Sequence, residues 1–317
     1  MRTKYFTNLR GFATASSVVV ALFISACSQP YGAPNADGSL TMTNDHLGII
    51  GGQPVPANSA IAASTVFLWD VATQSSCSGT LYKFGIVVTA AHCLQTSPEN
   101  LRVIFARDAQ TALTNPQVAR KVLALRVDPN YCGVGCSDVG VLRYSGSTPS
   151  GYQPALRLQS YPEVGQEVVV AGYGMSDAIS QTGVGILRAV SLSLVSSNET
   201  YAYTVNMSGG TGMCFGDSGG PAFIKKGNLY YAWGVASGVN SDYCNDHGFY
   251  DDFRKGGWTE KTAIQLLGDA YKGTVCRMAD EESGFGLYKL ISTGDYRSVA
   301  NGAKLELIEY TRGQIGR

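Results

Sequence analysis

The sequence predicts a β-rich globular protein built as a sandwich or a barrel. The chain has 317 residues, of which 44% are hydrophobic, only 15% are charged, and 38 are glycines. Short apolar runs at 65–69, 85–89 and 167–171 are separated by turns rich in Gly, Pro and Asn. Long helical patterns do not alternate with these runs, which argues against a parallel α/β sheet.

The charge balance excludes one class of function. Lys and Arg together number 24, and so do Asp and Glu, so the formal net charge is zero. A nucleic-acid-binding domain carries a basic surface, which this balance does not provide. We therefore expect no nucleic acid among the partners.

The N-terminal segment, residues 1–26, has the pattern of a secretory signal. Arg2, Lys4 and Arg10 precede an apolar stretch of small residues at 11–26. The stretch is too short and too rich in Ser and Thr for a membrane anchor. Its removal takes away three basic residues and no acidic one, so the exported chain is slightly acidic.

The end of this signal leaves two alternatives for Cys27. The run ISAC at 24–27 resembles the lipobox of bacterial lipoproteins, in which the cysteine becomes the lipid-bearing first residue. The chain has eight cysteines, so lipidation of Cys27 leaves an odd number, whereas a free Cys27 allows four pairs. Parity argues against lipidation, but the lipobox and the polar stretch after it favour a bacterial outer-membrane lipoprotein, periplasmic or extracellular after release.

Residues 27–48 form a tether or a pro-segment, because they are poor in apolar residues and rich in Pro, Gly, Asn, Asp and Ser. The globular part begins at Ile49. Its last helix is expected after Thr259, a candidate N-cap, because apolar residues recur there at helical spacing: Ala263, Ile264, Leu267 and Tyr271.

The tail, residues 272–317, is expected to form a C-terminal β-hairpin extension. Residues 287–291 and 304–308 read as strands, and the Asn-Gly pair at 301–302 is a hairpin turn signal. The predicted domains are therefore 1–26, 27–48, 49–271 and 272–317.

Four short segments carry residues suited to chemistry. TAAHC at 89–93 places His92 at the end of an apolar run, and SDVGVL at 137–142 carries Asp138 into another. GDSGGP at 216–221 places Ser218 in a glycine-dense turn, where backbone N–H groups can converge. IIGG at 49–52 lies where the polar segment ends. Each segment taken alone also has an ordinary structural explanation.

Together and in this order, the four segments resemble the trypsin/chymotrypsin family of serine endopeptidases over roughly residues 49–270. The chain order His, Asp, Ser separates this family from subtilisins and α/β-hydrolases. The resemblance implies two six-stranded antiparallel Greek-key β-barrels of the chymotrypsin-like kind, with a C-terminal helix and a short β-rich C-terminal extension. It also implies hydrolysis of protein or peptide substrates with no cofactor, and three histidines without ligand spacing count against a metal.

The resemblance implies a role for each catalytic residue. Ser218 is the nucleophile, His92 is the general base, and Asp138 orients the imidazole. Asp128 is the alternative for the acid that orients the imidazole, but the residues after it do not match the strand that follows this acid in the family. The backbone N–H groups of Gly216 and Ser218 would bind the oxyanion.

The IIGG segment implies a zymogen that is activated by cleavage before Ile49. The new α-ammonium would pair with Asp217 and order the oxyanion turn. Gly48 stands where Arg or Lys is common, so an activating protease, or self-cleavage with another preference, is expected. Because Cys27 precedes the cut, cleavage would also release the enzyme from a lipid anchor.

The cysteines divide into pairs by the same resemblance. It implies disulfides between Cys77 and Cys93 and between Cys214 and Cys244, which suits an oxidising compartment. Two neighbouring cysteines, Cys132 and Cys136, can close a small loop of their own. Cys276 is then unpaired or joined to Cys27.

The resemblance also locates the substrate pocket. Gly212 lies at its floor, where trypsin-like enzymes carry Asp, so a preference for Arg or Lys is not expected. The walls are expected at Ser237 and Val239 on one side and at Gly248 on the other, where the glycine leaves depth. We expect cleavage after small or medium apolar residues. If Asp242 or Asp246 on the nearby loop points into the pocket, it would instead favour a substrate with Arg or Lys.

A catalytically inactive binding or adhesion protein on the same fold is the alternative function. Such a protein normally lacks a triad residue, whereas this chain retains the triad, the oxyanion positions and the activation pair. The sequence therefore favours an active endopeptidase.

Overall fold

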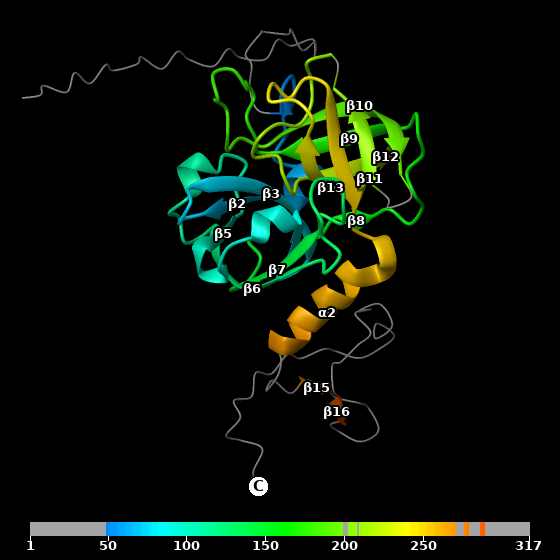
Figure 1. Cartoon of the computed structure of the whole chain (residues 1–317). Coiled ribbons are helices and arrows are strands. Elements are labelled where there is room, and N and C mark those ends of the chain that lie inside the picture. Colours follow the sequence, from blue (N-terminus) through cyan, green and yellow to red (C-terminus); the bar gives the residue numbers. More distant parts are fainter. Residues whose placement is uncertain (1–48, 199–201, 208, 271–275, 279–285, 289–317) are drawn as a thin grey trace, which may run out of the picture. The chain divides into compact units, whose positions relative to one another are not determined.

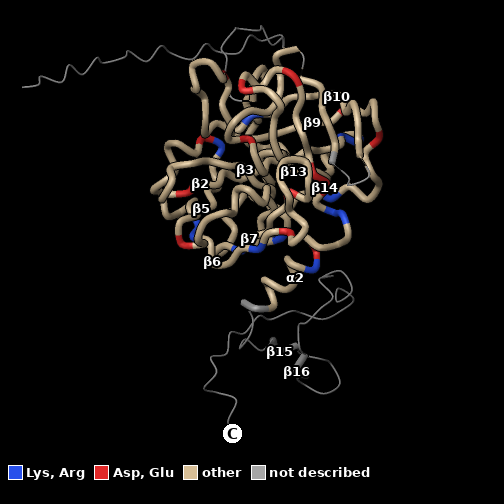
Figure 2. The backbone as a smooth tube through the Cα atoms, in the orientation of Figure 1, with Lys and Arg blue, Asp and Glu red and all other residues tan. Residues whose placement is uncertain are grey.

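The computed structural model describes residues 49–198, 202–207, 209–270, 276–278 and 286–288 (Figure 1). The predicted signal, the tether, Cys27 and most of the C-terminal extension lie outside these residues. Among the described helices, none is long and apolar enough to cross a membrane. Lys and Arg are interspersed with Asp and Glu along the backbone in the view of Figure 2.

Six antiparallel strands close into the first barrel in the order β2-β3-β4-β7-β6-β5. Their interior is filled by alternate apolar side chains such as Val66, Leu81 and Val103, all fully buried. The strands are β2 (Thr65–Asp70), β3 (Ser75–Lys83), β4 (Ile86–Thr89), β5 (Leu101–Ile104), β6 (Ala119–Val127) and β7 (Gly140–Tyr144).

A second ring of six strands closes in the order β9-β10-β11-β14-β13-β12, because β12 pairs back onto β9. Two short strands are added to it: β1 (Gln53–Pro54) pairs with β10 and β8 (Leu156–Arg157) with β13. The ring consists of β9 (Glu167–Gly172), β10 (Arg188–Ser197), β11 (Ala202–Asn206), β12 (Pro221–Lys226), β13 (Leu229–Val239) and β14 (His247–Asp252). The expected pair of barrels is confirmed.

Buried side chains from both barrels form a shared core. Phe67 and Ile104 of the first barrel belong to the same apolar cluster as Phe223 and Val235 of the second. The single hydroxyl proton of Tyr173 is shared between the carbonyls of Thr65 (3.1 Å) and Ala106 (2.9 Å). These contacts fix the two barrels against each other, which is what a site between them needs.

The predicted C-terminal helix is α2 (Trp258–Ala270). It begins one residue before Thr259, which is therefore not the N-cap. The Thr259 hydroxyl instead donates to the carbonyl of Phe253. Ala263 and Leu266 are buried and lie on the face of the helix that packs against the core.

Short helical segments complete the described chain. They are α1 (Ala60–Ser64), which is capped by Ser59, and the 3₁₀ turns η1 (Ala91–Leu94), η2 (Pro98–Asn100), η3 (Gln110–Ala112) and η4 (Lys255–Gly257). In the predicted extension, β15 (Cys276–Met278) pairs antiparallel with β16 (Gly286–Tyr288). The expected strand at 287–291 is thus described only at its start, and the one at 304–308 lies outside the described residues.

Candidate active site

His92 and Asp138 meet because of the register between β4 and β7. Thr89 pairs with Gly140 in this antiparallel ladder, so the residues after β4 and those before β7 lie at the same edge of the barrel. There the turn η1 presents His92. Its ring Nδ1 lies 2.7 Å from Oδ2 of Asp138, and its backbone N–H donates to Oδ1 at 3.0 Å.

Asp138 is fully buried and held from a second side. The Ser237 hydroxyl, on β13 of the other barrel, donates to Oδ2 of Asp138 at 2.7 Å. The carboxylate can only accept, so the Nδ1 atom of His92 must carry the proton in the neutral ring. The other ring nitrogen is left as a base. Asp128, the sequence-level rival, instead caps its own turn by accepting from the backbone N–H of Asn130.

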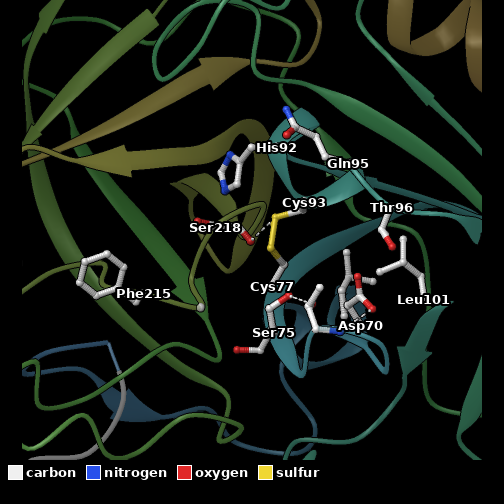
Figure 3. Close-up of a pocket in the computed structure, with 14 residues that line it drawn as sticks. Asp70, Ser75, Cys77, His92, Cys93, Gln95, Thr96, Leu101, Phe215 and Ser218 are labelled. Carbon is white, nitrogen blue, oxygen red and sulfur yellow. Dashed lines mark hydrogen bonds between the residues drawn. A yellow bond between two sulfur atoms is a disulfide. The ribbon is translucent and has the colours of Figure 1, made fainter.

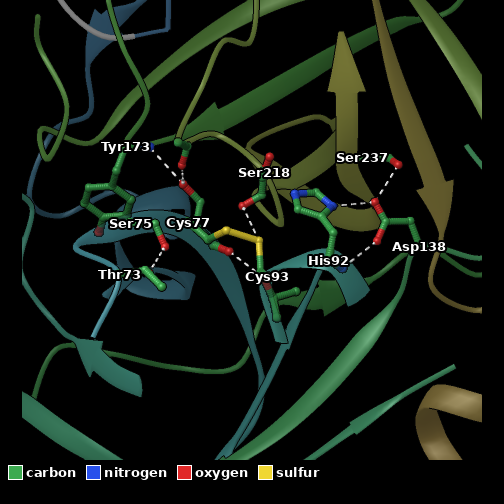
Figure 4. The surroundings of a disulfide bond; sticks show 12 residues. Thr73, Ser75, Cys77, His92, Cys93, Asp138, Tyr173, Ser218 and Ser237 are labelled. Atoms are coloured by element: carbon green, nitrogen blue, oxygen red, sulfur yellow. Dashed lines mark hydrogen bonds and ion pairs between the residues drawn. A yellow bond between two sulfur atoms is a disulfide. The ribbon is translucent and has the colours of Figure 1, made fainter. Parts of the chain in front are cut away.

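Ser218 lies on the far side of the imidazole, so that His92 stands between Ser218 and Asp138 (Figure 4). The turn that carries it is packed against the first barrel: the carbonyl of Ser218 accepts from the backbone N–H of Ser78 at 2.7 Å. A Cβ on Gly219, whose φ is +82°, would lie 1.9 Å from the Thr89 hydroxyl, which explains this glycine. Among the described residues, no hydrogen bond joins Oγ of Ser218 to the His92 ring, and such bonds commonly tighten only with substrate.

The two expected oxyanion donors lie in the same turn. Gly216 has φ +97°, and its carbonyl is fixed by the Ser78 hydroxyl at 2.9 Å. Neither its N–H nor that of Ser218 donates to an acceptor in the part of the chain that the structure describes. Both donors are therefore available to a negatively charged oxygen.

Asp217 points away from this turn into the second barrel and is almost fully buried. Its carboxylate accepts from the backbone N–H groups of Gly174 (2.7 Å) and Cys214 (2.8 Å). Burial raises the pKa of Asp217 to about 7, although these two hydrogen bonds and the charge of Arg188 act in the opposite direction.

The Ile49 segment lies next to the Asp217 loop. Ile49 is fully buried in the core of the second barrel, together with Cys214. Ile50 bridges to Gly212, whose N–H donates to the Ile50 carbonyl at 2.9 Å. The two residues of the predicted activation pair therefore belong to neighbouring segments.

Gly212 and Gly248, the expected floor and wall of the pocket, both face methionine side chains. A Cβ on Gly212 would lie 2.4 Å from Sδ of Met207, and one on Gly248 would lie 3.0 Å from Sδ of both Met207 and Met213. Both methionines are fully buried. Their thioethers thus occupy the space that the glycines leave, and the sequence reasoning missed both residues.

The remaining expected pocket positions lie on β13 and on the loop that follows it. Val239 pairs directly with Gly248 on the neighbouring strand, whereas the Ser237 side chain turns to Asp138. Asp246 is engaged on its own loop by Asn240 (2.6 Å) and His247 (2.7 Å), and Asp242 is exposed. Neither of these two acids thus supplies charge to the pocket floor.

A cavity of about 340 Å³ opens beside His92 and Ser218 (Figure 3). Phe215 and Gly216 line it next to Ser218, and the Cys77–Cys93 disulfide forms part of its wall. In Figure 3, the disulfide lies between Ser218 and the side chains of Asp70, Thr96 and Leu101. A substrate held across Ser218 can place its chain in this cavity.

All three expected disulfides are present. They join Cys77 to Cys93, Cys132 to Cys136, and Cys214 to Cys244. His92 lies close to Cys77 and Cys93, but the sulfurs bond to each other and offer no thiolate to a metal. Cys27 and any partner of Cys276 lie outside the described contacts.

Known proteins are similar to this chain over most of its length. A family model described as Trypsin matches residues 49–255. Trypsin alpha of Drosophila erecta is 30% identical over 254 residues, which cover 74% of this chain and 93% of that protein. A trypsin-like protease of Streptomyces glaucescens is 28% identical over 229 residues, which cover 65% of this chain and 81% of that protein.

Proposed function

The chain belongs to the trypsin family of serine endopeptidases, and from this premise we propose that Ser218, His92 and Asp138 cleave peptide bonds after small or medium apolar residues. The observation that carries the proposal is the arrangement of His92 between Ser218 and the buried Asp138 carboxylate. This order of nucleophile, base and orienting acid is the one that acyl transfer requires.

Each group has one task in the reaction. Oγ of Ser218 attacks the substrate carbonyl while the unprotonated nitrogen of His92 takes its proton. The N–H groups of Gly216 and Ser218 stabilise the oxyanion that forms, where one donor is worth about 10²- to 10³-fold in rate. The imidazolium, stabilised by Asp138, then protonates the leaving amine, and water hydrolyses the acyl-enzyme by the same steps.

The specificity proposal rests on the pocket. No carboxylate lies at the position of Gly212, so an Arg or Lys side chain would lose its hydration without gaining a partner. Met207 and Met213 fill the space beneath Gly212 and Gly248, so large aromatic side chains have little room. A small aliphatic side chain would contact the thioethers, which adapt well to apolar groups.

We further propose that the enzyme is exported as a lipoprotein precursor, activated by cleavage before Ile49 and released from its anchor by the same cut. The burial of Ile49 beside the Asp217 loop supports a role for the new N-terminus. Active enzyme that is still membrane-bound through an intact tether would contradict the release.

A serine-reactive fluorophosphonate tests the proposed activity. The probe should label the chain processed to an Ile49 N-terminus, and Ser218→Ala should abolish labelling while thermal unfolding stays unchanged. Peptide libraries should then show cleavage after Ala, Val or similar residues. If a correctly processed chain is not labelled, the inactive scaffold is the better description.

A further inference from the structure

One buried charge has no role in the reaction described above. Arg188, the first residue of β10, is only 2% exposed and is among the largest fully buried side chains. Its guanidinium donates a single hydrogen bond, of 3.3 Å, to the carbonyl of Ile186, and Nε has no partner among the described residues. A buried cation with so few hydrogen bonds is costly unless a negative charge lies near it.

The strand register places that negative charge. Arg188 pairs directly with Gly172 of β9 in an antiparallel ladder, so the two residues face the same side of the sheet. Gly172 has no side chain, and a Cβ there would lie 2.2 Å from Oδ1 of Asp217. The Asp217 carboxylate therefore occupies the space of the missing side chain, directly beside Arg188.

The two charges act on each other without touching. No ion pair or hydrogen bond joins Arg188 to Asp217 among the described contacts, so the attraction acts through space between two buried side chains, where salt screens it little. Burial lowers the pKa of Arg188, and the Asp217 charge opposes this. Tyr250, the other titratable group that senses Asp217, is buried with its pKa raised, and it is neutral at ordinary pH.

The uncut chain makes this cation necessary. While Ile49 is still joined to Gly48, it has no α-ammonium to offer to Asp217. In the structure the Asp217 carboxylate points inward and accepts from the backbone N–H groups of Gly174 and Cys214. Arg188 is the cation that the structure places beside it, and this cation does not depend on the cut.

We propose that Arg188 is a positioning residue that favours the ionised form of Asp217 and its inward orientation before the cut, so that the precursor has a basal activity. This inference rests on the proposed function and deepens its regulation. Cleavage before Ile49 then adds a second cation to a turn that is already formed. Activation is therefore graded, because Arg188 of β10 is present before the cut and only the α-ammonium of Ile49 is added by it.

The test compares Arg188→Met in the uncut and the cut chain. Fluorophosphonate labelling rates are measured on both forms, with N-terminal sequencing to verify each. We expect the uncut variant to label at least about tenfold more slowly than the uncut parent, because a buried partner charge has been removed. In the cut form the α-ammonium compensates, so the loss should stay below about threefold. Arg188→Lys should restore most of the uncut rate.

A matched control separates this role from simple packing. Arg143 of β7 also has a buried Nε without a described partner, and it lies in the first barrel. Arg143→Met should leave the ratio of cut to uncut rates unchanged. If Arg188→Met does not fold, Arg188→Gln, which keeps a donor for the Ile186 carbonyl, replaces it.

Three outcomes would overturn the inference. They are an equal loss in the cut and uncut forms, no loss in either form, and an uncut parent that is not labelled although the cut parent is. A parent that is not labelled in either form would instead count against the proposed function. In an Asp217→Asn background, Arg188→Met should have no further effect on the uncut rate, and a further loss would also contradict the inference.

Discussion

The backbone N–H of Gly135 donates a hydrogen bond of 2.9 Å to Oγ of Ser237, which in turn donates to Asp138. Gly135 belongs to the CGVGC loop, which the Cys132–Cys136 disulfide closes. The tip of this loop also contacts β13: Val134 lies 2.8 Å from where a Cβ of Gly238 would be. The disulfide between Cys132 and Cys136 thus holds the groups that orient the catalytic acid.

Opening this loop should slow catalysis. Replacing Cys132 and Cys136 by Ser removes a constraint worth roughly 2 kcal/mol in the unfolded chain. With the loop looser, Ser237 and Asp138 lose their fixed position, and we expect kcat to fall roughly three- to tenfold with little change in KM. Kinetics on one peptide substrate measure this. In a Ser237→Ala background the double variant should have no further effect on kcat, and an additive loss would contradict the link.

The methionines of the pocket should set its depth. Met213→Ala removes one thioether beneath Gly248. We expect the ratio of kcat/KM for a Phe substrate over an Ala substrate to rise at least about tenfold, because each added methylene in a hydrophobic pocket is worth about 1–3 kcal/mol. The variant should also lose about 2–5 kcal/mol of stability. Leu192→Ala truncates the same core away from Gly212 and Gly248, so it should lose stability without changing the ratio.

The predicted fold and triad came from motifs whose residues are close in sequence. Position 219 of the GDSGGP segment must be glycine, because the chain approaches Thr89 and Ser78 there. A local requirement of this kind is visible in the sequence. That His92 and Asp138 meet depends on the β4–β7 register. Periodicity alone does not reveal this register, and only the resemblance supplied it.

The features that sequence reasoning missed depend on packing between distant segments. The contact of Met207 and Met213 with Gly248 joins segments that are far apart in the sequence. A charged residue such as Arg188 at the start of a strand reads as solvent-facing. Arg188 is buried, and it pairs with Gly172, whose missing side chain leaves room for Asp217. The helix begins two residues earlier than an N-cap at Thr259 implies, because the turn η4 leads directly into α2.

Glu260 should anchor α2 to the first barrel. Its carboxylate accepts from the Tyr82 hydroxyl (2.8 Å) and pairs with Arg157 (2.6 Å) and Lys83 (2.8 Å). Burial raises the pKa of Glu260, but these donors and cations outweigh it, so the pKa lies below its ordinary value. A depressed pKa contributes stability above the unfolded value of 4.5, and this contribution is lost as the pH falls further.

Glu260→Gln should therefore be less stable than the parent at pH 7, by only about 1 kcal/mol, because the side chain is 35% exposed and solvent screens the pairs. The difference should shrink at pH 3.5. Thermal denaturation at the two pH values measures it. The exposed Glu163 provides the control, since Glu163→Gln should change neither value, and a constant loss at Glu260 would argue for packing instead of charge.

Asp251 should make the folded state less stable as the pH rises. It is 2% exposed on β14, where it pairs with Val235, and its carboxylate interacts with the Ser237 side chain. Burial, and then the negative charge of Asp138, raise the pKa of Asp251 to about 6. A group whose pKa is raised on folding contributes stability that is complete below the unfolded value, 3.8, and is lost as the pH rises through the folded value.

Asp251→Asn, which cannot ionise, should therefore match the parent at pH 4 and exceed it in stability at pH 7.5, by on the order of 2 kcal/mol. Urea denaturation of both chains in a Ser218→Ala background measures this without self-digestion. Asp242→Asn, on the exposed loop, should show no such trend. The same difference at both pH values would mean that the amide changes packing rather than removing a buried charge.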